Sequence, residues 1–287
     1  MVHGPPALHS LPSLEPEEED ALQRAVRRYR GEIIAYEPAV KLGTDTGAVH
    51  MQRVATRRLR SLLRSSGPLS SDPERAQRLS EELRRLARAL GKVRDHDVLI
   101  AYLLEELATL DEAAAFGAVL ELLDDERQDA RIKLRGVLES ARYRNLLHEL
   151  AQPPGLRDGE NLGSSAIAEY QRLREAVEQL DEDPSDRELH EVRIQVKRAR
   201  YAAEAAGARA RYVERARVLQ AILGEHQDAS VAERQIRELL ARVRGTGRTA
   251  IAAGRLIERQ RRRRVEARRA WKKAWKRVRR AAEAEWS

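Results

Sequence analysis

The sequence has no cysteine, a single phenylalanine and only 4% aromatic residues. Without cysteine, disulfides and thiolate-bound metals are excluded, and a reducing compartment is compatible. The longest apolar run, residues 98–104, is too short to cross a bilayer, and the N-terminal residues lack the basic start and apolar stretch of a signal peptide. We therefore expect a cytoplasmic protein with no membrane insertion.

Alanine, leucine, arginine and glutamate recur at helical spacing in a chain that is 42% apolar and 35% charged. This composition is typical of packed helices and predicts an all-α fold. Breaker residues divide the chain into a Pro-rich, disordered leader (1–14), a first antiparallel helical bundle (15–151), a linker (152–165) and a second bundle (166–287). Together the two bundles would form one domain.

Proline, glycine and capping residues set the expected helix boundaries. Pro38 should end the first helix, and the third, which begins at Pro73, could bend near Gly91. The predicted helices cover residues 16–36, 48–65, 73–107, 113–139, 141–150, 165–180, 186–206, 209–223, 226–244 and 248–285.

Positive charge is unevenly distributed along the chain. The net charge is +8, yet residues 255–280 alone carry +12, so the rest of the chain carries −4. Any anion site in the body must therefore come from local clustering on helix faces. Arginine supplies 47 of the 54 basic residues; its planar fork suits phosphate oxygens, although a GC-rich genome would give the same bias.

Two segments repeat one pattern of basic residues at an offset of 140 positions. VHMQRVATRRLRS begins at Val49 and LHEVRIQVKRARY begins at Leu189. The matched pairs are His50 with His190, Arg53 with Arg193, Arg57 with Lys197, Arg58 with Arg198, and Arg60 with Arg200. A second pair, LGKVRDHDV from Leu90 and LGEHQDASV from Leu223, aligns Asp95 with Asp228. The matches indicate an internal duplication.

On a helical wheel the first copy forms a cationic stripe opposite an apolar face. His50, Arg53, Arg57, Arg60 and Arg64 fall within an arc of about 80°, and His190, Arg193, Lys197 and Arg200 occupy the same arc in the second copy. Like charges at this spacing repel, which a bound anion would relieve. The stripe is about 21 Å long, a length that favours an extended chain of phosphates. A single stripe could equally be a solvated or salt-bridged face, but its recurrence favours a shared ligand site.

The four motifs, in this order, resemble those of the CHAD family, the conserved histidine α-helical domain, over about residues 16–280. The resemblance implies two pseudo-symmetric helical bundles around a basic central groove that binds inorganic polyphosphate, in some members at polyphosphate granules. Some members also carry a triphosphate tunnel hydrolase domain, but the residues before Pro16 are too few for one, so we expect no enzymatic activity. No cofactor is implied.

The resemblance also implies which residues bind. We expect Asp95 and Asp228 to orient arginines rather than to bind the ligand. We also expect phosphate to raise the pKa of His50 and His190, so that binding tightens as pH falls through about 6.5. The expected polyphosphate-binding residues are His50, Arg53, Arg57, Arg58, Arg60, Arg64, Lys92, Arg94, His190, Arg193, Lys197, Arg198, Arg200 and His226.

Two other functions compete with this interpretation. The C-terminal segment interleaves Trp271 and Trp275 with basic residues, a pattern suited to nucleic acid or an anionic membrane surface, although both could be core residues of a last bundle helix. The His96–Asp97 pair is compatible with a metal-dependent phosphohydrolase, but no second histidine and distal aspartate stand at a spacing that completes such a site.

Overall fold

The computed structural model describes residues 20–43, 45–110, 116–243 and 245–286, and within these ranges it is helical with no β-strand. This confirms the all-α prediction, while the predicted leader lies outside the described residues. The helices are α1 (Ala21–Leu42), α2 (Thr46–Ser66), the short 3-10 helix η2 (Gly67–Leu69), α3 (Pro73–Leu110), α4 (Gly117–Glu139), α5 (Ala141–Glu149), α6 (Leu162–Glu178), α7 (Asp186–Ala205), α8 (Ala210–Arg242) and α9 (Gly247–Trp286).

Several predicted boundaries were wrong. Pro38 lies inside α1, which ends only at Gly43, a left-handed residue (φ 72°) whose N–H donates to the Ala39 carbonyl at 3.0 Å. The turn after Pro38 buries Val40 in the core, which offsets the hydrogen bond that proline cannot make. Helix α8 is continuous where two helices were expected. The last four residues of the predicted linker, 162–165, already belong to α6, because Asn161 caps that helix.

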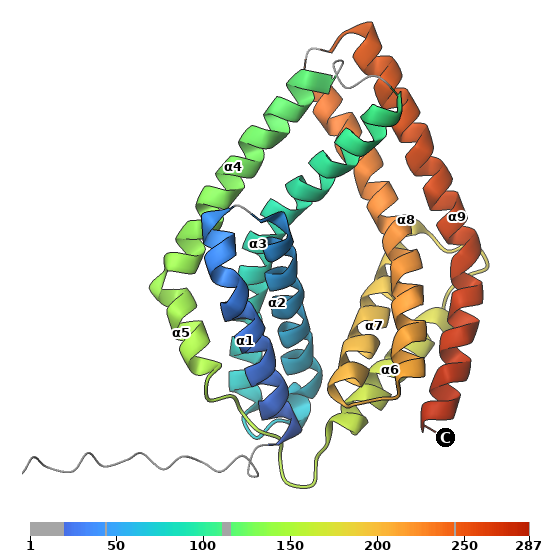
Figure 1. The fold of residues 1–287 in the computed structure, drawn as a ribbon. Coiled ribbons are helices and arrows are strands. Elements are labelled where there is room, and N and C mark those ends of the chain that lie inside the picture. The colour runs from blue at the N-terminus through green and yellow to red at the C-terminus, as the bar shows by residue number, and fades with distance from the viewer. Residues whose placement is uncertain (1–19, 44, 111–115, 244, 287) are drawn as a thin grey trace, which may run out of the picture.

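Two helical bundles form the lower part of the molecule (Figure 1). In the first, α1, α2, α5 and the first half of α3 pack with the end of α4 around a leucine-rich core that includes Leu59 and Leu83. In the second, α6 and α7 pack with the first half of α8 and the last part of α9 around Val196, Tyr212 and Trp275. Most of the apolar face of the α2 stripe helix is therefore used inside its own bundle.

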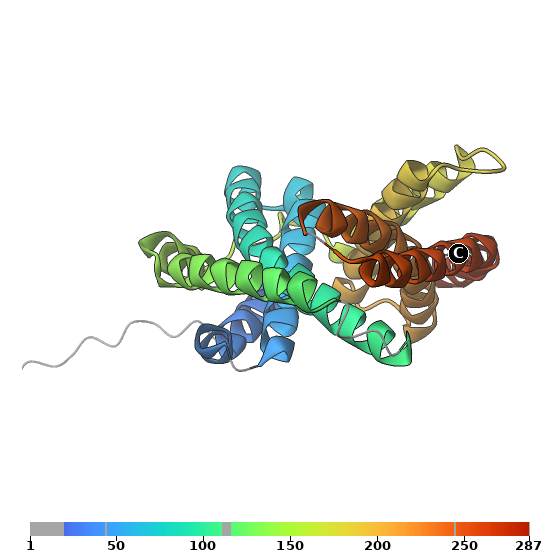
Figure 2. The same ribbon diagram turned by 90° about the horizontal axis from the view of Figure 1, so that it is seen from above.

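A third core joins the two halves at the opposite end of the molecule, which the sequence did not predict. There the end of α3 and the start of α4 meet the end of α8 and the start of α9, and Leu103, Phe116, Ile236 and Leu256 are buried together. From above, α4 and α9 run away from this junction in opposite directions (Figure 2). The long helices thus fix the spacing of the bundles, and α2 of the first lies against α7 of the second.

Truncating the junction core should destabilise the fold more than truncating an exposed apolar side chain. We expect Leu103→Ala to lower the free energy of unfolding by about 2–5 kcal/mol, because Leu103 is fully buried. The control, Ile132→Ala, removes a side chain that is 71% exposed and should cost less than about 0.5 kcal/mol. Urea titration followed by circular dichroism measures both, and equal losses would contradict a structural role for the junction.

Candidate anion-binding groove

The two predicted stripes face each other across a cleft of about 300 Å³ between α2 and α7. We call this cleft the groove. Its walls come from both bundles, as the sequence predicted for matching stripes, and no acidic residue is among those that line it. The lining residues are Arg57, Arg60, Ser61 and Arg64 of α2, and His190, Arg193, Ile194, Lys197, Arg198 and Tyr201 of α7.

One arginine in each stripe is held by the aspartate of the second motif. Arg53 Nη2 lies 3.7 Å from Asp95 Oδ1, and the matched Arg193 Nη2 lies 3.8 Å from Asp228 Oδ1. Both carboxylates remain well exposed and at ion-pair rather than close hydrogen-bond distance. This geometry fits the expectation that the aspartates orient the two arginines without forming close hydrogen bonds to them.

The glycine of the same motif provides the space in which Arg53 lies. A Cβ at position 91 would overlap Arg53 Nη1, whereas a Cβ at position 224 would lie 3.8 Å from Arg193 Nε, an ordinary contact. A side chain at position 91 would therefore push the Arg53 guanidinium out of its present position, while the backbone conformation of Gly91 makes no demand for glycine.

Burial and mutual repulsion disfavour the charged forms of the groove cations. The pKa of Lys197 falls to about 7, first because of burial and then because Arg193 and Arg57 lie nearby. The pKa of Arg64 falls to about 10, through burial and the charge of Arg198. Burial is also the main cause that lowers the pKa values of Arg53, Arg60 and Arg193. The groove thus concentrates positive charge that its own residues do not neutralise.

Some buried guanidinium nitrogens at the groove have no hydrogen-bond acceptor in the described part of the protein. They are the Nε atoms of Arg60, Arg193 and Arg198. A buried donor without an acceptor costs about 1–3 kcal/mol. An oxyanion in the groove would supply acceptors in a region where the protein supplies few.

Two predicted residues from different helices, His50 of α2 and Arg94 of α3, lie close together beside Arg53. Arg94 on α3 is close enough to His50 that its charge, after burial, lowers the pKa of the imidazole. His190 is oriented by Gln227, because its Nδ1 lies 2.9 Å from Gln227 Oε1. In the free protein the pKa of His50 is therefore below 6.5, so phosphate binding at this histidine should be accompanied by proton uptake.

Seven of the fourteen predicted residues are not among those that line the groove. Arg53 lies near the lining residues Arg57 and Arg193, and His50 and Arg94 lie next to Arg53.

The other four predicted residues are held elsewhere. Arg200 is only 6% exposed, and its guanidinium donates to Glu204 at 2.7 Å and to Gln220 at 3.0 Å. Arg58 shares Glu204 at 3.9 Å. Lys92 is exposed on α3 and does not line the groove.

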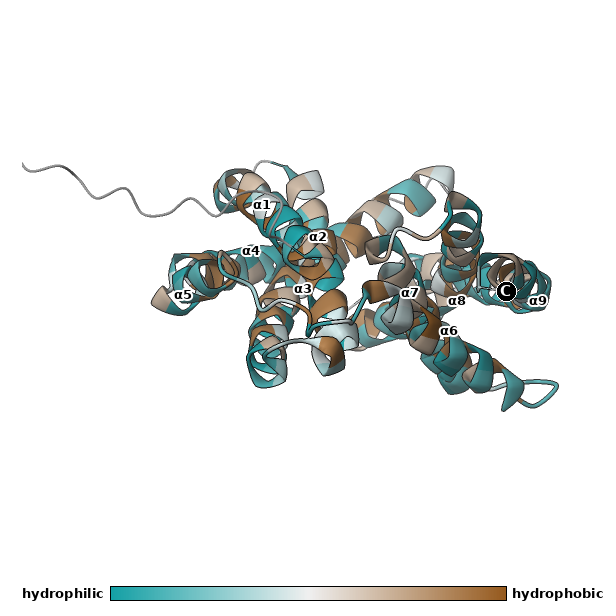
Figure 3. Ribbon diagram, turned by 90° about the horizontal axis from the view of Figure 1, so that it is seen from below, coloured by the Kyte–Doolittle hydropathy of each residue, from teal (hydrophilic) through white to brown (hydrophobic). Residues whose placement is uncertain are grey.

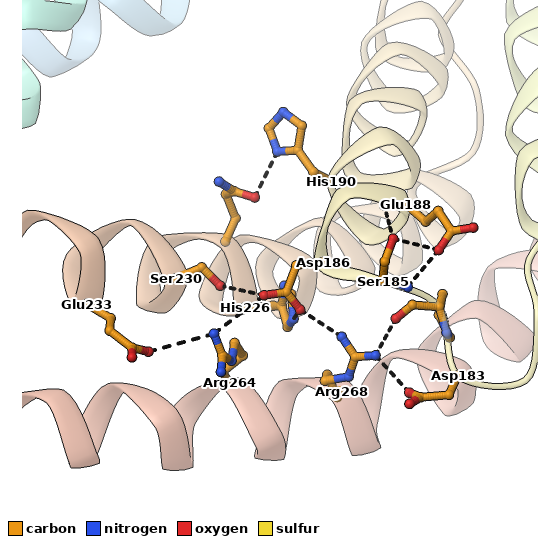
Figure 4. Close-up of polar contacts among 12 residues, drawn as sticks. Asp183, Ser185, Asp186, Glu188, His190, His226, Ser230, Glu233, Arg264 and Arg268 are labelled. Atoms are coloured by element: carbon orange, nitrogen blue, oxygen red, sulfur yellow. Dashed lines mark hydrogen bonds and ion pairs between the residues drawn. The ribbon is translucent and has the colours of Figure 1, made fainter.

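His226 is the fourth of these residues, and it is 2% exposed. Its Nε2 lies 3.2 Å from Asp186, and Arg268 donates to the same carboxylate at 2.9 Å (Figure 4). Burial is the main reason that its pKa is lowered. In this view His190 lies apart from the cluster. His226 therefore joins α8 to the start of α7 and to α9, and it is not available at the groove surface.

A further cation near the groove was not predicted, although it is not among the lining residues and pairs with Glu81 at 3.4 Å. Arg84 on α3 is close enough that its charge contributes to the lowered pKa of Arg60. Seven residues separate it from Gly91, which places both on one face of the helix. A helical wheel of α3 centred on the Gly91–Asp95 face would have identified it.

The residues that suggested a metal site or a nucleic-acid surface contact other parts of the protein in the structure. Asp97 is buried and lies 3.7 Å from Arg127 and 3.5 Å from Arg131, while His96 Nε2 lies 3.4 Å from Glu126. Both thus connect α3 to α4, and the described residues hold no group of three or more histidines and carboxylates suited to a metal. Trp271 and Trp275 are core residues of the second bundle. Within the described ranges, no helix is long and apolar enough to span a membrane.

Residues 24–237 match the CHAD domain family. The chain belongs to the CHAD family. Two uncharacterised proteins, from two strains of Mycobacterium tuberculosis, are 34% identical to it over 233 residues, which cover 76% of this chain and 45% of each relative. The chain thus spans less than half of the length of these relatives. CHAD membership confirms the resemblance seen in the sequence and supports a role related to polyphosphate.

Solved structures give the same result for the fold. PptA from Streptomyces chartreusis is similar with a TM-score of 0.75 and 25% identity, over 89% of this chain and 98% of that one. The CHAD domain from the plant Ricinus communis is similar with a TM-score of 0.72 and 26% identity, over 88% of this chain and 90% of the other.

The two motif glycines of this CHAD protein offer a matched test of how Arg53 is positioned. Gly91→Ala should displace the Arg53 guanidinium and weaken polyphosphate binding by about tenfold, the loss expected for one charge-assisted contact. Gly224→Ala should bind like the parent, because its Cβ fits beside Arg193. Fluorescence titration with labelled polyphosphate measures both. Equal affinities for the two variants would argue against this account of Gly91.

Proposed function

We propose that this protein binds inorganic polyphosphate in the groove between α2 and α7 and performs no chemistry on it. The observation that carries the proposal is that two cationic stripes face each other with buried guanidinium nitrogens that have no acceptor among the described residues. Phosphate oxygens would provide those acceptors and replace repulsion between the stripes with attraction. CHAD family membership supports the same ligand class.

The extent of the stripes favours a chain of phosphates over a single one. From His50 to Arg64 the α2 stripe measures about 21 Å along the helix axis, and cations of α7 run beside most of it. An orthophosphate would contact two or three of these cations and leave the others repelling each other. A flexible chain of linked phosphates can engage the whole groove.

The chemistry of the lining residues supports binding without turnover. The groove presents guanidinium, ammonium and imidazole groups, together with the hydroxyls of Ser61 and Tyr201. No carboxylate that could activate water or hold a divalent cation is among these lining residues, and Asp95 and Asp228 each face an arginine. A positively charged cleft would also repel a catalytic metal.

Competition between polyphosphate and DNA at fixed ionic strength tests the proposal. Changing Arg53, Arg57, Arg193 and Lys197 together to alanine should weaken polyphosphate binding at least about 100-fold, since charge-assisted contacts contribute about 1.5–3 kcal/mol each. A control removes four exposed basic residues that do not line the groove, namely Arg78, Lys133, Arg248 and Arg269. It should bind nearly like the parent.

The same titrations separate polyphosphate from other ligands. Affinity should rise with chain length and fall with added salt, because counterions are released on binding. DNA should compete weakly, since Trp271 and Trp275 are buried and cannot stack on bases. A groove variant with the affinity of the parent, or DNA that displaces polyphosphate at equal phosphate concentration, would refute the proposal. Phosphate release from the parent would refute the non-catalytic part alone.

Lys197 should make binding dependent on pH near neutrality. Its pKa of about 7 means that the free groove loses this charge as pH rises, whereas bound polyphosphate favours the protonated amine. Binding should therefore be tightest below pH 6 and require proton uptake above pH 7. Between pH 6 and 8 this group should weaken affinity by about tenfold.

Calorimetry in two buffers of different ionisation enthalpy measures that proton uptake directly. Lys197→Arg keeps the charge throughout this range and should bind with little pH dependence above pH 7. His50→Gln removes only the contribution of the imidazole, so the part of the dependence that comes from Lys197 should remain. If Lys197→Arg retains the full pH dependence of the parent, Lys197 is not its source.

A further inference from the structure

A second group of cations lies at the outer edge of the second bundle, where the start of α8 meets the end of α9. Arg211 and Arg215 are one turn apart on α8, and Arg277 and Arg280 are nearly one turn apart on α9. The four side chains are exposed and enclose a hollow of about 270 Å³. We call these four residues the α8/α9 cluster.

Carboxylates near the α8/α9 cluster pair with other arginines. Glu214 accepts from Arg217 at 2.8 Å, which lowers the pKa of the glutamate. Glu283 lies 3.6 Å from Arg279, and Glu285 accepts from the backbone N–H of Arg209 at 2.9 Å. The hydrogen bonds and ion pairs of these acidic groups go to residues outside the cluster, although the charge of Arg215 also contributes to the lowered pKa of Glu214. Four like charges remain around one hollow, an arrangement that is unfavourable until an anion enters.

The α8/α9 cluster is separate from the groove. Seen from below, the helices follow the order α2, α7, α8 and α9, so the groove lies on one side of the second bundle and α9 on the other (Figure 3). The tryptophans of α9 point into the core rather than toward the cluster. The surface therefore offers guanidinium forks without stacking partners, which suits phosphate oxygens better than nucleic-acid bases.

We propose that Arg211, Arg215, Arg277 and Arg280 form a second phosphate-binding site that takes a short run of linked phosphates. Each pair spans only about one helical turn, so the site matches a few phosphates and not a long chain. If the groove binds polyphosphate as proposed above, one protein molecule can hold two separate segments. It would then cross-link long polyphosphate chains.

Calorimetric titration of the full chain with tripolyphosphate tests the second site. The parent should bind at two sites, and a variant with all four cluster arginines changed to alanine should bind at one. The groove variant should also keep one site, and the two sets combined should keep none. The control, which lacks Arg78, Lys133, Arg248 and Arg269, should keep both. Unchanged stoichiometry and affinity in the cluster variant would overturn the second site, whereas an unchanged groove variant would instead overturn the proposed function.

Competition identifies the ligand, and light scattering tests cross-linking. Orthophosphate should compete at the cluster at least about tenfold more weakly than tripolyphosphate, because it engages fewer of the four arginines. An acidic peptide or DNA that displaces tripolyphosphate more effectively than polyphosphate does would overturn the phosphate assignment. Long-chain polyphosphate can bind several protein molecules along its length. When protein and such binding segments of polyphosphate are mixed in about equal numbers, the parent should form large assemblies and the cluster variant should form small complexes. Assemblies of equal size from both proteins would overturn cross-linking through this site.

Discussion

Two rows of positive charge can be held face to face only if something other than the charges holds them there. In this protein α2 and α7 are each buried along their apolar sides within separate bundles, and a third core fixes the distance between the bundles. Apolar burial is worth roughly 25 cal/mol per Å² and is insensitive to ligand, so it can sustain repulsion of a few tenths of a kcal/mol per charge pair. The groove therefore remains assembled and positively charged before a ligand arrives.

Carboxylates decide which arginines of a stripe remain available. Asp95 and Asp228 are exposed and lie 3.7 and 3.8 Å from their arginines, so each aligns a guanidinium without enclosing it. Glu204 lies 2.7 Å from Arg200, which is itself buried, and that pair is neutralised within the protein. Both arrangements occur on α7, where Arg193 lies near an exposed aspartate and Arg200 is paired with Glu204. Distance and burial of the partner, rather than its mere presence, separate a binding arginine from a structural one.

Much of the fold and the centre of the site were predictable because they depend on local periodicity. The helical spacing of His50, Arg53 and Arg57 places them on one face of a helix regardless of the rest of the chain. The same holds for Lys197 in the second stripe. Pro38 and the continuity of α8 were missed, since packing of Val40 and Leu223 outweighs local breaking signals. His226 was wrongly expected at the groove, because the apolar pattern of the helix around it was not used. Its neighbours at three-residue spacing, Leu223 and Ala229, are buried and marked the inward face of α8.

The basic C-terminal segment shows why a run of charge in the sequence does not define a surface. Its first half passes the acidic residues of other helices, and Arg259 binds Glu106 while Arg268 binds Asp183 and Asp186. These ion pairs use part of the net negative charge of the rest of the chain. This half of the segment therefore has a structural role, because it joins α9 to other elements. Beyond it, Arg277 and Arg280 meet Arg211 and Arg215 instead of carboxylates. One helix thus changes from neutralised to cationic along its length because its neighbours change, and only the second part is free to attract an anion.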